Sequence, residues 1–347
     1  MKRLNSIDFI KVIGIITMIQ IHLGMYLLSY SARTSNFYHF MSFLGKIAAP
    51  LFLFAVGINL VISVNNRKKQ AKPHIFKRSL FLFIFGLLFL LIWQPSILHF
   101  IGLYLFLAYV LLFFSDKIKI LAITILTFGS LWLLKFIDYS SGWELLPYRL
   151  AGLWTIKGFF KNLLVTGYYP IFPCLAYVII GTIVGKYLIK SIKNKDLGKF
   201  TEHLLIAGAI ISVIGLALTK ITPWNLGFYP MQPPYILFFS GLNMVLLSAG
   251  LYLLDIKKKF PDFSKLMNFM GSTCLSIYIL HVIVGLSYFY FTSNFQFLSM
   301  IAGWIYIITI LIIITLISYV FKKKLGYGPF EYLMNVFVSD SKNKKRK

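Results

Sequence analysis

Apolar segments long enough to cross a lipid bilayer recur along this 347-residue chain. A helix needs about 20 predominantly apolar residues to span the hydrocarbon core. Hydrophobic residues make up 59% of the sequence and charged residues only 13%, so a soluble fold of this size would have a mostly apolar surface. The sequence therefore predicts an all-α fold, a polytopic integral membrane helical bundle.

Ten apolar stretches account for most of the chain, and we expect each to be a membrane-spanning helix. They cover residues 7–30, 38–64, 79–94, 96–115, 119–136, 168–190, 202–220, 235–254, 268–290 and 297–321. A long, less apolar segment separates the fifth stretch from the sixth. We expect a transmembrane domain over residues 1–325, followed by a basic cytoplasmic tail over 326–347.

The distribution of charge predicts the orientation. The chain holds 35 Lys and Arg against 10 Asp and Glu, a net charge of +25. With both termini in the cytoplasm, most of these cations fall on the cytoplasmic side, as the positive-inside rule describes. The exceptions are Arg33, Lys46, Lys135, Arg149, Lys157, Lys161 and Lys220. We therefore expect contact with anionic membrane lipids and no nucleic-acid binding, because no soluble basic domain is left over.

Two other readings of the sequence are less favoured. Cys174 and Cys274 lie far apart in apolar stretches without C-x-x-C spacing, which is typical of small buried side chains rather than of a metal or redox site. The first thirty residues have a basic start and an apolar core, but Asp8 and Lys11 interrupt that core and no small-x-small cleavage site follows. We expect an uncleaved first span, no metal, and a compact protein of the prokaryotic plasma membrane.

The first stretch carries an acid, a base and an imidazole. At about 100° per residue, Lys11 and His22 share one helix face about 16 Å apart, and Asp8 lies within about 60° of it. A Lys or Asp at the middle of a membrane costs about 2.5–3.5 kcal/mol on insertion scales, so the pattern predicts a functional site. An imidazole accepts protons near neutral pH, which makes His22 the candidate general base.

The loop after the second stretch ends in Lys77 and Arg78. Such a pair can simply anchor a helix at the cytoplasmic face. Alternatively, it can bind the phosphates of a cytosolic cofactor, because Lys and Arg donate charge-assisted hydrogen bonds to phosphate oxygens. The residues leave both interpretations open.

Candidate substrate contacts lie in the segment 137–167 and in the ninth stretch. The segment is rich in aromatic residues, as a carbohydrate-binding surface or a membrane-interface belt would be. Glu144 and Arg149 can pair with each other or contact an acceptor. We take these two residues, Trp154 and the intramembrane His281 as candidate substrate contacts.

These residues resemble the motifs of two related families. Lys11-x10-His22 is similar to the basic-x10-His motif of the acyltransferase-3 family of membrane acyltransferases. The opening Arg3-Leu-Asn-Ser-Ile-Asp8-Phe-Ile-Lys11 resembles the R-L-x-S-[VIL]-D-x-x-R start of the heparan-α-glucosaminide N-acetyltransferase family. Further similarities to that family and its relatives follow in chain order, in Ala49–Gly57, Ile97–Gly102, Ser276–His281 and Gly328–Glu331.

The resemblance implies an integral-membrane enzyme of ten or eleven spans that transfers an acyl group, usually acetyl. The donor would be cytosolic acyl-CoA, and the acceptor a hydroxyl or amine of a sugar or glycolipid at the far face. Lys11, Lys77 and Arg78 would then contact acyl-CoA, and Asp8 would belong to the catalytic set. Transfer to oxygen or nitrogen, directly or through an acyl-histidine, stays open, as does assembly into a homo-oligomer.

The position of the catalytic histidine differs between the two families. The acyltransferase-3 family has it where His22 stands, whereas the heparan family usually has an amide there and a later histidine before the second span. His39 is the nearest equivalent, at a different spacing, and Lys11 replaces the commoner arginine. The sequence therefore favours His22 with His39 in reserve. A transporter or flippase that binds solute or protons at the buried charges is the alternative function.

Overall fold

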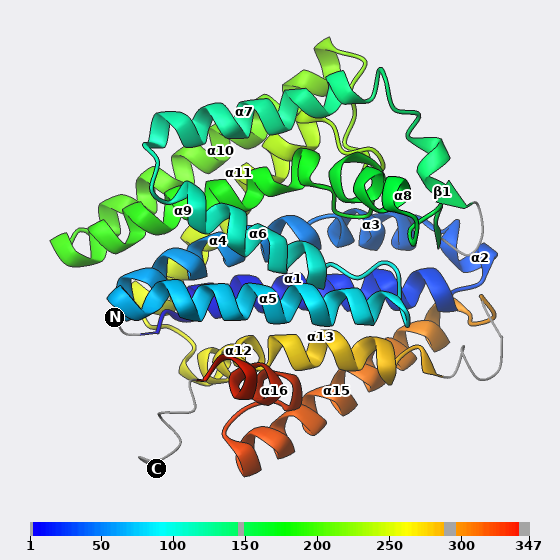
Figure 1. Ribbon diagram of the computed structural model, residues 1–347. Coiled ribbons are helices and arrows are strands. Elements are labelled where there is room, and N and C mark those ends of the chain that lie inside the picture. Colours follow the sequence, from blue (N-terminus) through cyan, green and yellow to red (C-terminus); the bar gives the residue numbers. More distant parts are fainter. Residues whose placement is uncertain (1–2, 145–148, 288–295, 340–347) are drawn as a thin grey trace. The chain divides into compact units, whose positions relative to one another are not determined.

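The structure is a computed structural model that describes residues 3–144, 149–287 and 296–339 (Figure 1). Helices make up most of this part of the chain, so the all-α prediction is confirmed. The described strands are β1 (Trp143–Glu144) and β2 (Arg149–Leu150), which pair antiparallel. The chain divides into two compact units, one built on Leu53–Ala249 and the other on Arg3–Phe52 and Gly250–Val336.

The unit built on Arg3–Phe52 and Gly250–Val336, called here the histidine unit, is assembled around α1. Its elements are α1 (Asn5–Leu27), α2 (Tyr30–Arg33), α3 (Asn36–Gly45), η4 (Leu251–Ile256), α12 (Pro261–Ser272), α13 (Cys274–Ile283), α15 (Met300–Leu325) and α16 (Pro329–Val338). The helix α1 packs against α3, α12, α13 and α15. Many of its apolar side chains are correspondingly buried, with Ile10, Ile15 and Leu23 inaccessible to solvent.

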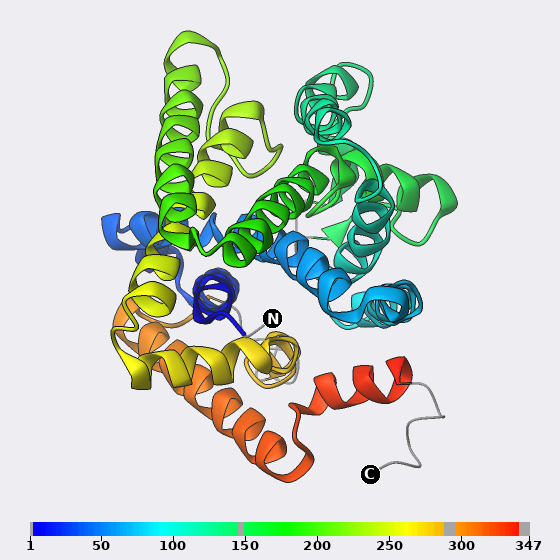
Figure 2. The ribbon, with the colours of Figure 1, turned by 90° about the vertical axis from the view of Figure 1, so that its left-hand side faces the viewer.

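The ninth apolar stretch is not one continuous helix. It folds as α12 and α13, which meet at an angle of 67°. Figure 2 shows the bend, with α12 running across the view and α13 seen nearly end-on. The break falls at Thr273, whose φ of −113° and ψ of 23° are not helical. The sequence prediction of a single span over 268–290 missed this break, and residues 288–290 lie outside the described part.

The unit built on Leu53–Ala249, called here the loop unit, holds the middle of the chain. Its elements include most of α4 (Ala48–Arg67), then η1 (Lys68–Gln70), α5 (Ala71–Leu90), α6 (Leu98–Leu111), α7 (Asp116–Leu133), η2 (Ser140–Gly142), β1, β2, α8 (Ile156–Lys161), η3 (Asn162–Thr166), α9 (Ile171–Asn194), α10 (Leu197–Ile221) and α11 (Pro233–Gly250). Gly57 and Gly181 let α4 and α9 approach closely, because a Cβ on either would collide with the opposite backbone. Small residues at a contact between two membrane helices commonly allow such a close approach.

Six helical segments in the described residues are long and apolar enough to cross a membrane, or seven if the bent pair α12–α13 counts as one span. One of them, Asn36–Leu90, is 55 residues long and contains α3, α4, η1 and α5. The chain is therefore a multi-pass membrane protein by length and composition.

Candidate functional site

Two buried histidines face each other in the histidine unit. His22 on α1 is 8% exposed and His281 on α13 is 0% exposed. Nδ1 of His22 lies 3.1 Å from Nε2 of His281, and the two rings stack at 20° with centroids 5.3 Å apart. The structure thus joins the predicted general base to a residue predicted as a substrate contact, although 259 positions separate them in the chain.

The hydrogen bonds of the pair define its tautomers when both rings are neutral. Nδ1 of His281 bonds to the carbonyl oxygen of Tyr278, and a carbonyl can only accept, so Nδ1 of His281 carries the proton. Nε2 of His281 is then an acceptor, and Nδ1–H of His22 donates to it. His22 is left with a lone pair on Nε2, the arrangement that a general base requires.

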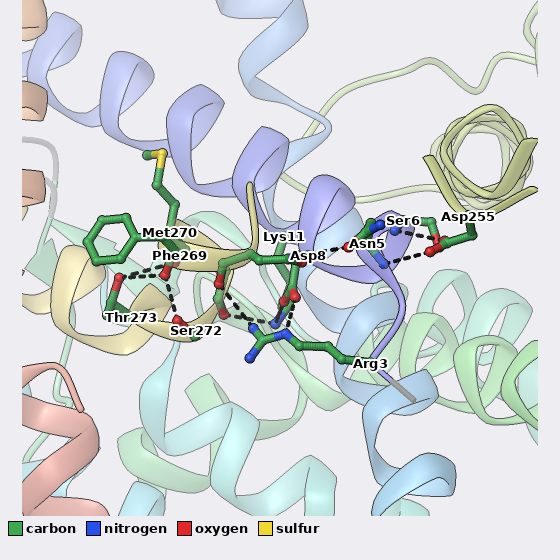
Figure 3. Close-up of polar contacts among 12 residues, drawn as sticks. Arg3, Asn5, Ser6, Asp8, Lys11, Asp255, Phe269, Met270, Ser272 and Thr273 are labelled. Carbon is green, nitrogen blue, oxygen red and sulfur yellow. Dashed lines mark hydrogen bonds and ion pairs between the residues drawn. The ribbon is translucent and has the colours of Figure 1, made fainter. Parts of the chain in front are cut away.

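Asp8 lies near the N-terminus of α1 and is 2% exposed. Figure 3 shows its carboxylate between two cations, with Nε of Arg3 and Nζ of Lys11 each 2.5 Å from one of its oxygens. Lys11 also donates to the carbonyl oxygen of Gly271 at 2.8 Å. The Asp8–Lys11 ion pair and the Lys11–Gly271 hydrogen bond together tie α1 to the end of α12. Compensation by two cations makes a buried carboxylate tolerable.

A second carboxylate, which the sequence did not indicate, caps α1. Asp255 in η4 accepts hydrogen bonds from the backbone N–H groups of Asn5 at 2.8 Å and Ser6 at 3.0 Å (Figure 3). The residue before the helix, Leu4, has no side chain that can cap it. Asp255 therefore satisfies donors that would otherwise lack acceptors and complements the positive end of the helix dipole. The signal available in the sequence was an acid at the end of an apolar stretch, just before three lysines.

His39, the reserve candidate, lies elsewhere in the histidine unit. It is exposed on α3, and the centroid of its ring lies 6.3 Å from that of the neighbouring Tyr38. The helices α1 and α3 are joined by Gln20, whose side-chain amide donates to the carbonyl oxygen of Met41 at 2.9 Å. His22 thus contacts the buried imidazole of His281, whereas His39 is exposed and lies outside this histidine pair.

The other predicted site residues belong to the loop unit. Lys77 and Arg78 are half-buried on α5, which already begins at Ala71, so the sequence prediction that they end a loop was wrong. Glu144 and Arg149 are exposed and lie directly opposite each other in the β1–β2 ladder. A pairing of their side chains stays a prediction. Trp154 is 60% exposed.

Aromatic side chains gather beside this ladder. The Trp143 ring lies 4.7 Å from that of Tyr168 and 5.1 Å from that of Tyr229, both edge-on. Such clusters offer flat apolar faces of the kind that stack on sugar rings or on lipid headgroups.

Comparison with known families places these residues in context. Residues 3–215 match the family described as heparan-alpha-glucosaminide N-acetyltransferase, catalytic. The chain belongs to this family. Its membership confirms the expected resemblance and, with the apolar helices, supports a membrane acetyltransferase. Residues 190–339 match a family of proteins of unknown function, DUF418. No curated protein matches the chain.

The facing histidines come from different matched regions. His22, Asp8 and Lys11 lie within the stretch that matches the acetyltransferase family, and His281 lies within the stretch that matches DUF418. In the described residues no three His, Cys, Asp or Glu side chains are grouped as metal ligands.

Proposed function

We propose that this protein is an integral-membrane acetyltransferase with His22 as its general base. It moves an acetyl group from cytosolic acetyl-CoA to a hydroxyl or amine of a sugar or other envelope acceptor at the far face of the membrane. The observation that carries the proposal is the contact between His22 and His281, which directs the His22 proton to Nδ1 and leaves Nε2 as the acceptor. Family membership supports the acetyl group and its donor.

The reaction needs one base and one positioned thioester. Nε2 of His22 takes the proton of the acceptor O–H or N–H while the acceptor atom bonds to the acetyl carbon. The C–S bond breaks, and the CoA sulfur leaves with the proton that His22 had taken. His281 accepts a hydrogen bond from Nδ1–H of His22 throughout, so it stabilises the positive charge that develops on that ring. Attack by Nε2 itself, which gives an acetyl-histidine, is the alternative route.

The donor's phosphates need cations, and each unit by itself contains candidates. In the histidine unit, Arg3 and Lys11 outnumber the carboxylate of Asp8 that they share. In the loop unit, Lys77 and Arg78 lie within α5, six and seven residues after its first residue, Ala71. Guanidinium and ammonium groups suit phosphate oxygens, so we retain Lys11, Lys77 and Arg78 as acyl-CoA contacts. Glu144, Arg149 and Trp154 remain the proposed acceptor contacts.

Ten crossings with both termini in the cytoplasm complete the proposal. A 55-residue helical stretch at 1.5 Å per residue is about 80 Å long, more than twice the roughly 30 Å of hydrocarbon, which favours two crossings within Asn36–Leu90. The shorter α6 and the 18-residue α7 add two more. We propose the plasma membrane of a prokaryote as the location.

The experiment compares His22→Ala with His39→Ala in purified protein reconstituted in liposomes. Labelled acetyl-CoA is the donor, glucosamine supplies an amine, and methyl glucoside supplies a hydroxyl. Loss of a general base costs about 10²–10⁴-fold, so His22→Ala is expected to lose transfer by that factor while His39→Ala retains it. The reverse result would assign the base to His39. An envelope glycan extract is tested as a third acceptor. If the wild type transfers no acetyl group to any of the three acceptors, the proposed function is contradicted.

A further inference from the structure

The helix that carries His281 begins without a cap of its own. It starts at Cys274, directly after the break, and the preceding Thr273 makes no side-chain hydrogen bond to it. The Thr273 hydroxyl instead donates back to the carbonyl oxygen of Phe269 at 3.1 Å. The first backbone N–H groups of a helix have no acceptors within the helix, and those of α13 are buried among other side chains. Acceptors must therefore come from another part of the chain.

Glu331 supplies them from α16. One carboxylate oxygen accepts from the backbone N–H of Leu275 at 2.8 Å and from that of Ser276 at 3.1 Å. The other oxygen accepts from the hydroxyl of Ser276. Glu331 is 7% exposed, so the contact is shielded from water. A carboxylate at this place also complements the positive end of the α13 dipole.

The surrounding chain holds this carboxylate in one position. The backbone N–H of Phe330 donates to the Ser276 hydroxyl oxygen at 3.0 Å. Gly328 has no room for a side chain, because an added Cβ would collide with the Glu331 carboxylate and the Ser276 hydroxyl. Two motifs noted in the sequence, Ser276–His281 and Gly328–Glu331, are thus the two halves of one contact.

His281 follows Ser276 by five residues, about 7.5 Å along the helix axis. The hydrogen bond of its ring to the carbonyl oxygen of Tyr278 lies within α13. The hydrogen bond from His22 on α1 joins two helices, so its geometry depends on where α13 lies. A shift or fraying of the first turn of α13 would move Nε2 of His281 relative to Nδ1 of His22. Misplacement of a catalytic group by about 1 Å can cost about 10²-fold in rate.

We propose that Glu331 is a positioning residue that holds α13 so that His281 can direct the tautomer of His22. The proposal rests on the proposed function for its effect on catalysis, whereas its structural content, the coupling of Glu331 to the histidine pair, does not. Glu331 contacts neither ring itself and acts through α13. Other acids of the histidine unit serve other contacts: Asp8 pairs with Arg3 and Lys11, and Asp255 caps α1.

The test uses the full chain and the variant Glu331→Gln, which keeps the shape of the side chain and one acceptor oxygen but removes the charge. The matched control is Glu202→Gln, an exposed acid on α10 in the loop unit. We expect Glu331→Gln to lower kcat about 10-fold and Glu331→Ala about 100-fold, with KM for acetyl-CoA within about 2-fold of the wild type. Glu202→Gln is expected to change neither.

The second measurement is independent of transfer. Nitrogen NMR of ¹⁵N-histidine protein, assigned with His281→Ala and His22→Ala, reports which ring nitrogens carry protons. In the wild type, we expect N–H at Nδ1 of both rings, and in Glu331→Gln an altered pattern for both. If Glu331→Ala does not fold, Ser276→Ala is measured in its place. It removes one donor to the carboxylate and should give the same change more weakly.

The outcomes separate the two proposals. Unchanged histidine signals in Glu331→Gln would overturn the positioning role, whether or not kcat falls. Altered signals with a lower kcat would support it. If the wild type transfers no acetyl group, the proposed function fails, and the NMR result alone decides whether Glu331 controls the histidine pair.

Discussion

Asp8 is a carboxylate in an apolar helix, and ion pairs and tightly packed backbone surround it. Arg3 and Lys11 neutralise it from one side, and the main chain of Gly271 packs against the other. A Cβ added to Gly271 would lie 2.5 Å from Oδ1 of Asp8 and 2.7 Å from its Cβ. Removing one partner of a buried ion pair typically costs about 3–5 kcal/mol, so the residue at position 271 must leave this pair undisturbed.

Gly271→Ala should therefore destabilise the protein. Overpacking typically costs about 1–3 kcal/mol, and the added methyl group would also push Lys11 away from the carbonyl oxygen that it contacts. Unfolding in mixed micelles measures the change. Gly198→Ala is the matched control, because a Cβ there meets nothing within 4 Å, and alanine favours a helix over glycine. Equal stability of the two variants would contradict the tight packing at Gly271.

At the scale of elements, charged side chains join helices at their ends. Asp116 in the first turn of α7 accepts a hydrogen bond from Lys186 of α9 at 2.6 Å and from the hydroxyl of Tyr187 at 3.0 Å. Lys119 lies 3.5 Å away on its own helix. The hydrogen bond from Lys186 is the main cause that holds the pKa of Asp116 below its ordinary value. The charged form of Asp116 therefore stabilises the contact between α7 and α9.

The sign of this shift predicts a dependence on pH. A carboxyl group with a lowered pKa stabilises the folded state above its unfolded value, near 3.9, and loses this effect as pH falls through the lower folded value. Asp116→Asn should reduce stability at pH 7 by at most about 1 kcal/mol, as partly exposed pairs do. The difference from the wild type should shrink below about pH 4. Thermal unfolding between pH 3 and pH 7 measures it, and a difference that does not vary with pH would contradict the argument.

At the scale of the whole molecule, the question is whether the chain binds a CoA thioester or carries a solute. The bent pair α12–α13 resembles the interrupted helices of transporters, which is the observation that keeps a transporter as the alternative. The family match and the histidine pair favour the enzyme. The two functions differ in what should stabilise the folded protein.

Acetyl-CoA should raise the unfolding temperature of the purified protein. A ligand at 100 times its Kd contributes about 2.7 kcal/mol if it binds only the folded state. Dephospho-CoA is the control for the 3′-phosphate, and Arg78→Ala is expected to reduce the shift if this arginine contacts a phosphate. No shift with any CoA compound, together with solute uptake in proteoliposomes, would favour the transporter.

Much of the helical framework could be predicted from composition. Apolar stretches of about 20 residues can form only helices in hydrocarbon, because every backbone N–H and C=O must bond within the segment. The break at Thr273 was not predicted, although Gly271-Ser272-Thr273 interrupts the apolar stretch there. A helix bends in a membrane only where neighbouring elements satisfy the freed backbone groups, and the sequence does not show those neighbours. Here those neighbours are Lys11 at Gly271 and Glu331 at Leu275.

In the candidate site, too, the sequence indicated some features and not others. Asp8, Lys11 and His22 stood out in the sequence because polar side chains are costly within a span, and a helix necessarily places them near one face. Their pairings did not stand out. His281 was a candidate, but its contact with His22, 259 positions away, was not predicted, and neither was that of Asp255 with Asn5, 250 positions away. Local patterns carry no information about which distant groups will meet.

The sequence by itself determined that this chain spans a membrane, that it belongs among acetyltransferases, and that α1 carries the acid, the base and the imidazole. Only the tertiary structure decided that His22 faces His281 and that carboxylates from η4 and α16 cap the helices that bear these two rings. The physical reason is that helix formation in an apolar medium is satisfied within each segment. A cap or an imidazole pair, in contrast, is satisfied only when separate segments pack together.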